Sequence, residues 1–455
     1  MMKFDVEQEA AIKAMLSGKN VFLIGKAGTG KSVVIREFVC RSTRAVTLLA
    51  PTGTAAQNIG GNTIHRLFKF PAADYISEDM ARQAAESNAA VLASIQIIVI
   101  DEISMVRCDL MTAMDVALKH VMPPQYRELP FGGKQLIVVG DFCQLPPVLC
   151  NLFVQEYVAA MNIGIFAFHS PAWAMAKFKY ITLTKVHRQT DQLLLEIANC
   201  IRSGHVNAPM NQDVLATHGI FTPMSCIDVF NHKCYLQPTI EGNPIHLCSL
   251  RHCALALNQC YLSALPDKGI IFPGWISGDF PNDLLPTAQK LLVKRGSRMM
   301  LLGNKANSDG VYEYTNGTIG TVIDYSRDAS AGVSLVLDNG HVVTVGKTLW
   351  CNYDYELVQD GHGNTSLQRH EVGFYHQLPL TACYAMTIHK CQGATLSGPV
   401  PLTLGTNPCF APGQFYTAIT RAKSLDQISI DRPATALDCK ISEDVWLFHR
   451  EHDIQ

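Results

Sequence analysis

The sequence lacks the features that place a protein in a membrane or outside the cell. It has no run of eighteen apolar residues, which a membrane-spanning helix needs. Residues 1–10 carry acidic side chains and lack the apolar core of a signal or transit peptide. The 15 cysteines include no C-x-x-C pair, which is typical of free thiols in a reducing compartment. We therefore expect a cytoplasmic protein that does not bind a membrane.

The chain also lacks an excess of basic charge. The formal net charge of the 455 residues is -2, so no overall basic field indicates nucleic-acid binding, although a local basic track stays compatible with it. Hydrophobic residues make up 48% of the chain, which indicates a globular protein. The length of 455 residues is enough for about three domains. Cys248, Cys253 and Cys260, with His246 and His252, have spacings that miss the usual zinc pattern, so we expect them to pack in a core.

The most informative stretch is a glycine-rich loop between an expected strand at 20–24 and an expected helix at 33–39. It matches the pattern G-x-x-x-x-G-K-[ST] and reads Gly25-Lys26-Ala27-Gly28-Thr29-Gly30-Lys31-Ser32. Glycines let backbone N–H groups close around phosphate oxygens, and the N-terminus of the helix faces the same anion. We expect Lys31 to reach the β- and γ-phosphates of a nucleotide and Ser32 to hold Mg²⁺. The alternative is a turn that binds nothing.

Two further strands end in residues suited to the same chemistry. The apolar strand at 97–100 is followed by Asp101 and Glu102, and its burial in a parallel sheet would leave both acids beside the phosphate loop. Asp101 can then complete the Mg²⁺ shell, while Glu102 takes a proton from the attacking water. The strand at 135–139 continues through Gly140 and Asp141 to Gln144, which is either a γ-phosphate sensor or a turn residue.

Four other segments stay open on the residues alone. Gln8, in an expected helix at 4–17, is either a reader of the adenine edge or a surface glutamine. The loop from Pro51, after a strand at 45–50, either contacts a ligand or only connects two elements. Arg188, after a strand at 180–184, either enters a nucleotide site or lies in water. Residues 71–95 are polar and alanine-rich and form either a helical spacer or a functional wedge.

The second half of the chain predicts another α/β unit. Its expected strands and helices lie at 245–251, 252–265, 400–404, 412–421 and 427–430. Between 294 and 345 the pattern changes to short alternating strands with an Asn339-Gly340 hairpin signal, which is typical of a small inserted β-barrel.

Seven segments then occur in a telling order: Ala50–Gly53, Gly61–His65, Asp101–Met105, Pro130–Gly133, Gly140–Val148, Ile388–Gly393 and Tyr416–Ala422. They resemble the PIF-one (petite integration frequency) DNA helicases of helicase superfamily 1, subclass B, from about Gln8 to Ile430. The resemblance implies an α/β fold with two RecA-like P-loop domains, each a parallel sheet flanked by helices. The domains would comprise 1–65 with 96–185 and 186–305 with 379–455, plus a candidate wedge at 66–95 and an SH3-like β-barrel at 306–378.

The resemblance also implies roles for individual residues. Gln8 becomes the adenine reader, Gln144 the γ-phosphate sensor, and Arg188 and Arg421 the arginine fingers, which act in catalysis with Lys31 and Glu102. The implied nucleotide-binding residues are Gln8, Gly25, Ala27, Gly28, Thr29, Gly30, Lys31, Ser32, Gln144 and Gly393. Ser32 and Asp101 would hold the metal. The positions that match contacts to single-stranded DNA are Pro51, Thr52, Gly53, Thr63, His65, Thr387, His389 and Lys390.

The implied function is an ATP-dependent, Mg²⁺-dependent DNA helicase that moves 5′ to 3′ on single strands. We expect a monomer that acts on forked or tailed duplex DNA, with G-quadruplexes and RNA–DNA hybrids as further candidate substrates. The absence of the flanking domains of eukaryotic relatives favours a bacterial nucleoid or a virus-infected host cytoplasm. Two alternatives stay open: a DNA-stimulated translocase that remodels protein–DNA complexes, and a nucleotide-gated recruitment module with little turnover.

Overall fold

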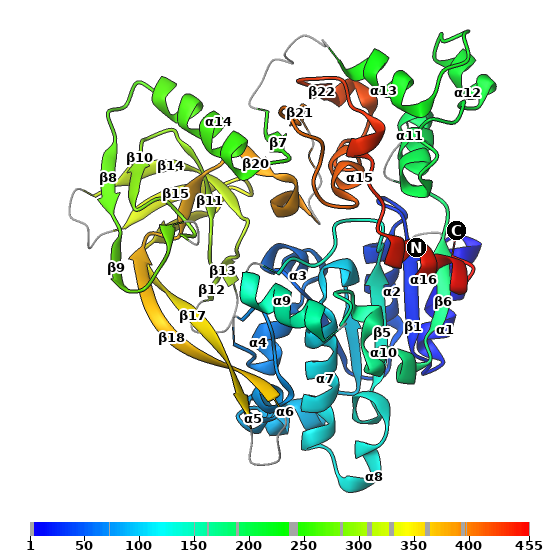
Figure 1. Ribbon diagram of the computed structural model, residues 1–455, viewed down its shortest axis with the longest axis vertical. Helices are drawn as coiled ribbons and strands as arrows, with labels where there is room; N and C mark the ends of the chain where they lie inside the picture. Colours follow the sequence, from blue (N-terminus) through cyan, green and yellow to red (C-terminus); the bar gives the residue numbers. More distant parts are fainter. Residues whose placement is uncertain are drawn as a thin grey trace. The chain divides into compact units, whose positions relative to one another are not determined.

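The computed structural model describes residues 4–454 except 72, 150, 162, 188–190, 236–243, 283–284, 307–311, 327–331, 360–364, 393–395 and 397. The chain forms two compact units, Met1–Gly242 with Cys391–Gln455 and Asn243–Lys390, each of which is described by itself (Figure 1).

The first unit is built on a six-stranded parallel sheet with the strand order β3-β2-β4-β5-β1-β6. Its strands are β1 (Val21–Gly25), β2 (Val46–Ala50), β3 (Asn62–Thr63), β4 (Ile97–Ile100), β5 (Gln135–Gly140) and β6 (Lys179–Leu183). Every residue of β1, β4 and β5 is buried, as their near-continuous apolar sequences predict for central parallel strands. The carboxyl ends of these strands therefore meet at one edge of the sheet.

Helices cover both faces of this sheet, because alternate residues of β1 enter two different cores. Val21 and Leu23 pack with α1 (Val6–Leu16), α2 (Lys31–Arg41) and α3 (Gly53–Ile59). Phe22 and Ile24 belong to the other core, whose helices are α4 (Ile64–Phe68), α5 (Glu78–Glu86), α6 (Ala89–Ser94), α7 (Cys108–Val121), α10 (Pro171–Ala176) and α16 (Glu443–Glu451). The C-terminal helix α16, red in Figure 1, thus returns to the sheet that opens the chain, and Phe448 lies 6.4 Å from Phe22 between ring centroids.

The remaining elements of the first unit follow the sheet or come from the last part of the chain. Its other helices are α8 (Pro124–Arg127), α9 (Leu152–Ala160), α11 (Gln192–Ser203), α12 (Gln212–Thr217), α13 (Cys226–Cys234) and α15 (Gln414–Ile419). β21 (Val400–Thr403) and β22 (Ile428–Ile430) pair in parallel. Short 3₁₀ turns are η1 (Ile103–Met105), η2 (Pro130–Gly133), η3 (Ala167–His169), η6 (Leu425–Gln427) and η7 (Ala436–Asp438).

The second unit is mostly antiparallel. A five-stranded sheet has the order β16-β15-β14-β11-β19, built from β11 (Arg298–Leu301), β14 (Ile319–Tyr325), β15 (Val333–Leu337), β16 (Val342–Val345) and β19 (Leu380–Ala382). Smaller sheets are formed by β8 (Ile270–Pro273), β9 (Trp275–Gly278), β10 (Lys290–Val293), β12 (Lys305–Ala306), β13 (Tyr312–Tyr314), β17 (Thr348–Gln359) and β18 (Thr365–Gln377). β7 (His246–Cys248) pairs in parallel with β20 (Ala385–Thr387) beside α14 (Arg251–Ala264), and η5 (Ile388–Cys391) follows β20.

The predicted α/β class, with parallel strands flanked by helices, is confirmed. The short alternating strands and the Asn339-Gly340 hairpin are also found, with Gly340 at a φ of 86°. Two strands of the five-stranded sheet, β11 and β19, come from outside 306–378, so an SH3-like domain with those bounds stays a prediction, as do the other domain boundaries.

Some features differ from the expectations or were missed by them. The segment 71–95 contains the helices α5 and α6, whose Ala81, Ala85 and Leu92 are completely buried in the first unit's core, while the role of a wedge stays a prediction. The long β17–β18 hairpin and the helices α12 and α13 were not predicted. Core packing is wrong for His252 and Cys260, which are exposed because α14 buries the side that carries Ala254, Asn258 and Leu262.

Within the described ranges, each cysteine is a free thiol, and no group of three or more His, Cys, Asp or Glu side chains could hold a metal ion. None of the helices in the same ranges is both long and apolar enough to span a bilayer.

Candidate nucleotide site and DNA-contact residues

The glycine-rich loop joins the end of β1 to the first residue of α2. Gly28 and Gly30 have φ values of 83° and 84°, which glycine adopts without strain. A Cβ at Gly25 would lie 2.4 Å from Thr29 Oγ1, so the loop leaves no room for a side chain there. No side chain caps the N-terminus of α2. Uncapped N–H groups beside a glycine loop form a site for an anion such as a phosphate group.

Lys31 lies over this loop. Its Nζ donates to the carbonyl oxygens of Gly25 at 2.6 Å and Lys26 at 3.0 Å. Ala27 and Thr29 are buried in the loop, and Thr29 Oγ1 donates to the Lys26 carbonyl at 3.0 Å. Ser32, predicted to hold Mg²⁺, follows as the second residue of α2 and is partly exposed.

The two predicted acids stand at the carboxyl end of β4. Asp101 is buried, and its Oδ1 accepts a hydrogen bond from the Glu102 backbone N–H at 2.9 Å. Burial and the neighbouring Glu102 raise the pKa of Asp101 to about 7, while the positive charge of Lys31 opposes this rise. Lys31 thus compensates only part of the negative charge of Asp101 and Glu102, and a divalent cation would supply the remaining positive charge.

Glu102 has an unusual backbone and an unsatisfied side chain. Its φ is 52°, a left-handed conformation that is strained for a residue with a Cβ and occurs preferentially at functional sites. Its Oε2 is buried and has no hydrogen-bond partner among the described residues. A desolvated carboxylate oxygen without a partner is suited to accept a proton from a ligand or a water molecule.

The loop after β5 meets the turn that follows α15 through Gln144 and Arg421, both buried. Arg421 Nη2 lies 3.4 Å from Gln144 Oε1 and 3.2 Å from Thr420 Oγ1, and its Nε donates to the Thr417 carbonyl at 3.0 Å. The predicted sensor and the predicted arginine finger are thus in contact. The chain segments that carry them are far apart in the sequence.

Gln8 lies against the phosphate loop, so the alternative of a surface glutamine is wrong. Its side chain is only 6% exposed, its Nε2 donates to the Thr29 carbonyl at 3.4 Å, and its Oε1 accepts from the Asp5 backbone N–H at 3.3 Å. His187, in the loop after β6, donates its backbone N–H to the Gly28 carbonyl at 2.8 Å. The neighbouring Arg188 and the predicted Gly393 lie outside the described residues.

The predicted DNA contacts of the first unit lie at one edge of its sheet. β2 and β3 pair with Ala50 opposite Thr63, so Pro51–Gly53 follows the carboxyl end of β2, and Thr63–His65 begins at the carboxyl end of the neighbouring β3. Thr63 Oγ1 accepts the Arg66 N–H at 3.2 Å and caps α4, while Thr52 Oγ1 accepts the Ala55 N–H at 3.3 Å.

Three predicted DNA contacts belong to the second unit. Thr387 ends β20, and His389 and Lys390 lie in η5. Burial lowers the pKa of both His389 and Lys390, and the charge of Arg251 lowers that of Lys390 further. The imidazole of His389 is therefore neutral at pH 7 and offers hydrogen bonds rather than charge.

Several residues of the site had no role in the sequence-based prediction. Asp141, Tyr416 and Arg202 form a buried cluster beside Gln144. Asp141 and Tyr416 lie in two of the seven segments that carry the resemblance, but neither was given a role, and Arg202 lies in none of them. Gln392 was also missed, although its Nε2 donates to Ser104 Oγ at 3.0 Å, next to Glu102.

Buried side-chain atoms without a hydrogen-bond partner gather in this region. Among the described residues they are Glu102 Oε2, Arg202 Nε, Gln392 Oε1 and Thr417 Oγ1. All belong to residues of the site or to their direct neighbours, and buried polar groups are rarely left without a hydrogen bond. A polar ligand with several charged oxygens, such as a nucleoside triphosphate with a divalent cation, fits this set of donors and acceptors.

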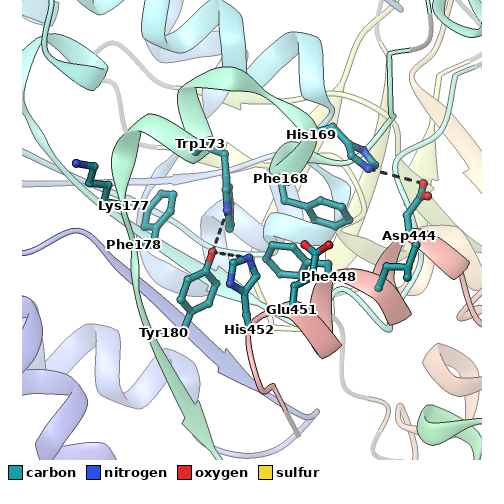
Figure 2. A pocket seen from close by; sticks show the side chains of 12 residues that line it. Phe168, His169, Trp173, Lys177, Phe178, Tyr180, Asp444, Phe448, Glu451 and His452 are labelled. Carbon is teal, nitrogen blue, oxygen red and sulfur yellow. Dashed lines mark hydrogen bonds and ion pairs between the residues drawn. The ribbon is translucent and has the colours of Figure 1, made fainter.

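A cavity of about 550 Å³ lies apart from this site, between α10, β6 and α16 (Figure 2). Aromatic rings line it, and Trp173 donates to Tyr180 Oη at 3.4 Å across it. His169 Nε2 and Asp444 Oδ2, both from lining residues, lie 3.8 Å apart. None of the residues predicted to bind nucleotide or DNA lines this cavity.

The half-buried side chains of His449 and His65 are expected to lower the free energy of unfolding in acid. Burial and the charge of Arg202 lower the pKa of His449 to about 4, and burial with Arg107 does the same for His65. Between pH 6.5 and 4 the unfolded chain binds a proton at each position that the folded chain does not, so stability falls as the pH falls. At pH 5 each imidazole is expected to cost on the order of 1–2 kcal/mol of unfolding free energy.

Urea denaturation at pH 7.5 and pH 5 measures this effect. We expect His449→Asn to lose less stability between the two pH values than the wild type does, because its share of the proton uptake is gone. An identical loss in both proteins would show that His449 titrates normally in the folded state.

Comparisons with known proteins agree with these features. A family model described as PIF1-like helicase matches residues 3–200. The ATP-dependent DNA helicase Pif1 of Bdellovibrio bacteriovorus is 29% identical and aligns over 92% of this chain and 85% of its own. The ATP-dependent DNA helicase PIF1 of Homo sapiens is 30% identical over 93% of this chain, which spans only 60% of that longer protein.

Solved structures give the same result over the whole chain. The crystal structure of Pif1 helicase from Bacteroides in complex with ADP-AlF3 and single-stranded DNA superposes with a TM-score of 0.79 at 27% identity, covering 100% of this chain and 98% of that one. Pif1 helicase from Candida albicans gives a TM-score of 0.72 at 26% identity. With sequence relatives and solved structures that both extend over nearly its full length, the chain has the fold of the Pif1 helicases and is similar to them in sequence.

Proposed function

We propose that the protein is an ATP-dependent DNA helicase that moves 5′ to 3′ on single-stranded DNA. The observation that carries this proposal is that the phosphate loop, Glu102 and Gln144 follow the carboxyl ends of the neighbouring parallel strands β1, β4 and β5, with Arg421 in contact with Gln144. Buried polar atoms without a hydrogen-bond partner among the described residues lie in the same region. The relatives named above are ATP-dependent DNA helicases, and one solved relative holds ADP-AlF3 and single-stranded DNA, which supports ATP as the fuel and DNA as the track.

Each nucleotide-site residue has a proposed task. Lys31 and the loop N–H groups bind the phosphates, and Glu102 accepts a proton from the attacking water. Gln144 and Arg421 contact the γ-phosphate, Arg188 supplies a second arginine, and Gln8 binds the adenine edge. The remaining loop residues and Gly393 approach the nucleotide through their backbones.

Asp101 and Ser32 are the proposed holders of Mg²⁺. When bound, the ion neutralises charge on the phosphate oxygens. The raised pKa of Asp101 fits this role, because a cation beside a buried carboxylate favours its ionised form.

DNA grip is proposed to rest on hydroxyls, backbone amides and a few cations rather than on a broad basic surface. The net charge of -2 supports this view. Pro51, Thr52, Gly53, Thr63 and His65 would contact DNA from the first unit, and Thr387, His389 and Lys390 from the second. A monomeric state, a wedge at 66–95, activity on G-quadruplexes or RNA–DNA hybrids and a cytoplasmic setting stay predictions.

Steady-state phosphate release tests the proposed function. We expect turnover to require Mg²⁺, to rise severalfold when a single-stranded oligonucleotide is added, and to disappear in Lys31→Ala. Lys19→Ala, an exposed lysine just before β1, is the matched control and should behave as the wild type does. Hydrolysis that ignores DNA, or that survives in Lys31→Ala, would contradict the proposal.

A further inference from the structure

Arg202, in the last turn of α11, reaches the loop that follows β5. Its side chain is 8% exposed, and its Nε lies 3.5 Å from Oδ1 of Asp141, whose side chain is 0% exposed. Asp141 also accepts hydrogen bonds from Tyr416 Oη at 2.9 Å and from the Cys143 backbone N–H at 3.2 Å. One buried carboxylate thus joins a residue of α11, a residue of α15 and the backbone of its own loop.

The charge of Arg202 keeps this carboxylate ionised. Burial by itself would raise the pKa of Asp141, but Arg202 and then Lys31 hold that pKa below its ordinary value. A buried carboxylate that loses its cation either takes up a proton or destabilises the fold. Arg202 is therefore the main charge that stabilises the Asp141 carboxylate, which accepts hydrogen bonds from Tyr416 and from the Cys143 N–H.

The same loop carries Gln144. The Gln144 N–H donates to the Asp141 carbonyl at 3.1 Å, which closes a tight turn from the anchored carboxylate to the predicted sensor. Gly413, the residue before α15, contacts the opposite side of this loop. A Cβ on Gly413 would lie 2.4 Å from the Cys143 carbonyl oxygen, so the two backbones are in close contact there. Arg421 Nη2 then meets Gln144 Oε1 at 3.4 Å. The position of the sensor is thus fixed by contacts on both sides of the loop.

We propose that Arg202 is a positioning residue for ATP hydrolysis, which holds Asp141 and thereby sets the loop that presents Gln144 to Arg421 and to the γ-phosphate. This inference rests on the proposed function of Gln144. Since Arg202 acts through the loop, its loss impairs the hydrolytic step and leaves the binding of a nucleotide without a γ-phosphate nearly unchanged.

A double-mutant cycle in the full-length protein tests this role. Arg202→Gln, Gln144→Ala and the double variant are compared by DNA-stimulated kcat and KM, and by binding of a fluorescent ADP analogue. We expect Arg202→Gln to lower kcat by about tenfold or more, with KM and ADP affinity within about twofold of wild type. Adding Arg202→Gln to Gln144→Ala should lower kcat no further, because the two residues act through one loop.

Three controls keep the result interpretable. Calorimetric melting shows whether each variant folds. If Arg202→Gln does not fold, Arg202→Lys, which keeps the charge and is expected to restore part of the lost kcat, carries the same cycle. Arg127→Gln removes an exposed arginine and should match the wild type.

Two outcomes would overturn the assignment of Arg202. One is multiplication of the two losses in the double variant, and the other is a fall in ADP affinity as large as the fall in kcat. Failure of the wild type itself to hydrolyse ATP would instead overturn the proposed function, and the positioning role with it.

Discussion

Replacing Glu102 with glutamine is expected to lower DNA-stimulated ATP hydrolysis by about 10²–10⁴-fold, the usual contribution of a general base. Glutamine has the shape of glutamate but cannot take a proton from water. The backbone of Glu102 is left-handed, and its buried Oε2 has no hydrogen-bond partner among the described residues. This oxygen is therefore available for such a transfer. Because shape is kept, nucleotide binding should change little, so the loss should appear in kcat rather than in KM.

Phosphate release measures the expected fall in kcat, and the affinity for a fluorescent ATP analogue measures whether nucleotide binding is unchanged. Glu128→Gln, at an exposed glutamate of the same unit, is the matched control and should leave the rate unchanged. A Glu102→Gln protein that turns over near the wild-type rate would remove Glu102 from the role of the base.

Removal of the Arg421 side chain is expected to cost more still. An arginine that stabilises charge on the transferring phosphoryl group contributes about 10³–10⁵ in rate, which corresponds to roughly 4–7 kcal/mol. Arg421 is buried, and its guanidinium contacts Gln144 and the Thr417 carbonyl, so Arg421→Ala should nearly stop hydrolysis. Opening one base-pair step costs only about 1.4 kcal/mol, so unwinding should fail because of the lost chemistry.

Loss of buried contacts could also unfold the protein, so Arg421→Lys accompanies Arg421→Ala. Lysine keeps the charge but cannot reproduce the guanidinium geometry, and it should fold while remaining severely impaired. Arg450→Ala removes an exposed arginine of α16 as the control. Near-normal turnover in a folded Arg421→Ala protein would refute the assignment of this arginine.

The centre of the fold was predictable because its signals are local. The strands around Leu23, Val99 and Val138 are continuous apolar runs, which only a sheet covered on both faces can bury. The phosphate loop requires glycine at fixed spacing, and Gly28 and Gly30 adopt left-handed φ values.

Features that depend on distant partners were not predictable. Arg202 reads as an ordinary polar residue at the end of an amphipathic helix, and only the folded chain brings it to Asp141. Gln8 reads as a surface residue for the same reason, since the loop that buries it follows later in the sequence. The β17–β18 hairpin, in contrast, was missed although Cys351, Tyr353, Tyr355 and Leu357 alternate with polar residues in the period-two pattern of a strand.

Strand displacement on two otherwise identical partial duplexes, one with a 5′ single-stranded tail and one with a 3′ tail, tests the central claim most directly. With ATP and Mg²⁺, the wild-type protein is predicted to unwind only the substrate with the 5′ tail, and Glu102→Gln neither. Unwinding from the 3′ tail alone would contradict the proposed direction. If neither tail supports unwinding while single-stranded DNA still stimulates hydrolysis, the protein is a translocase and not a helicase.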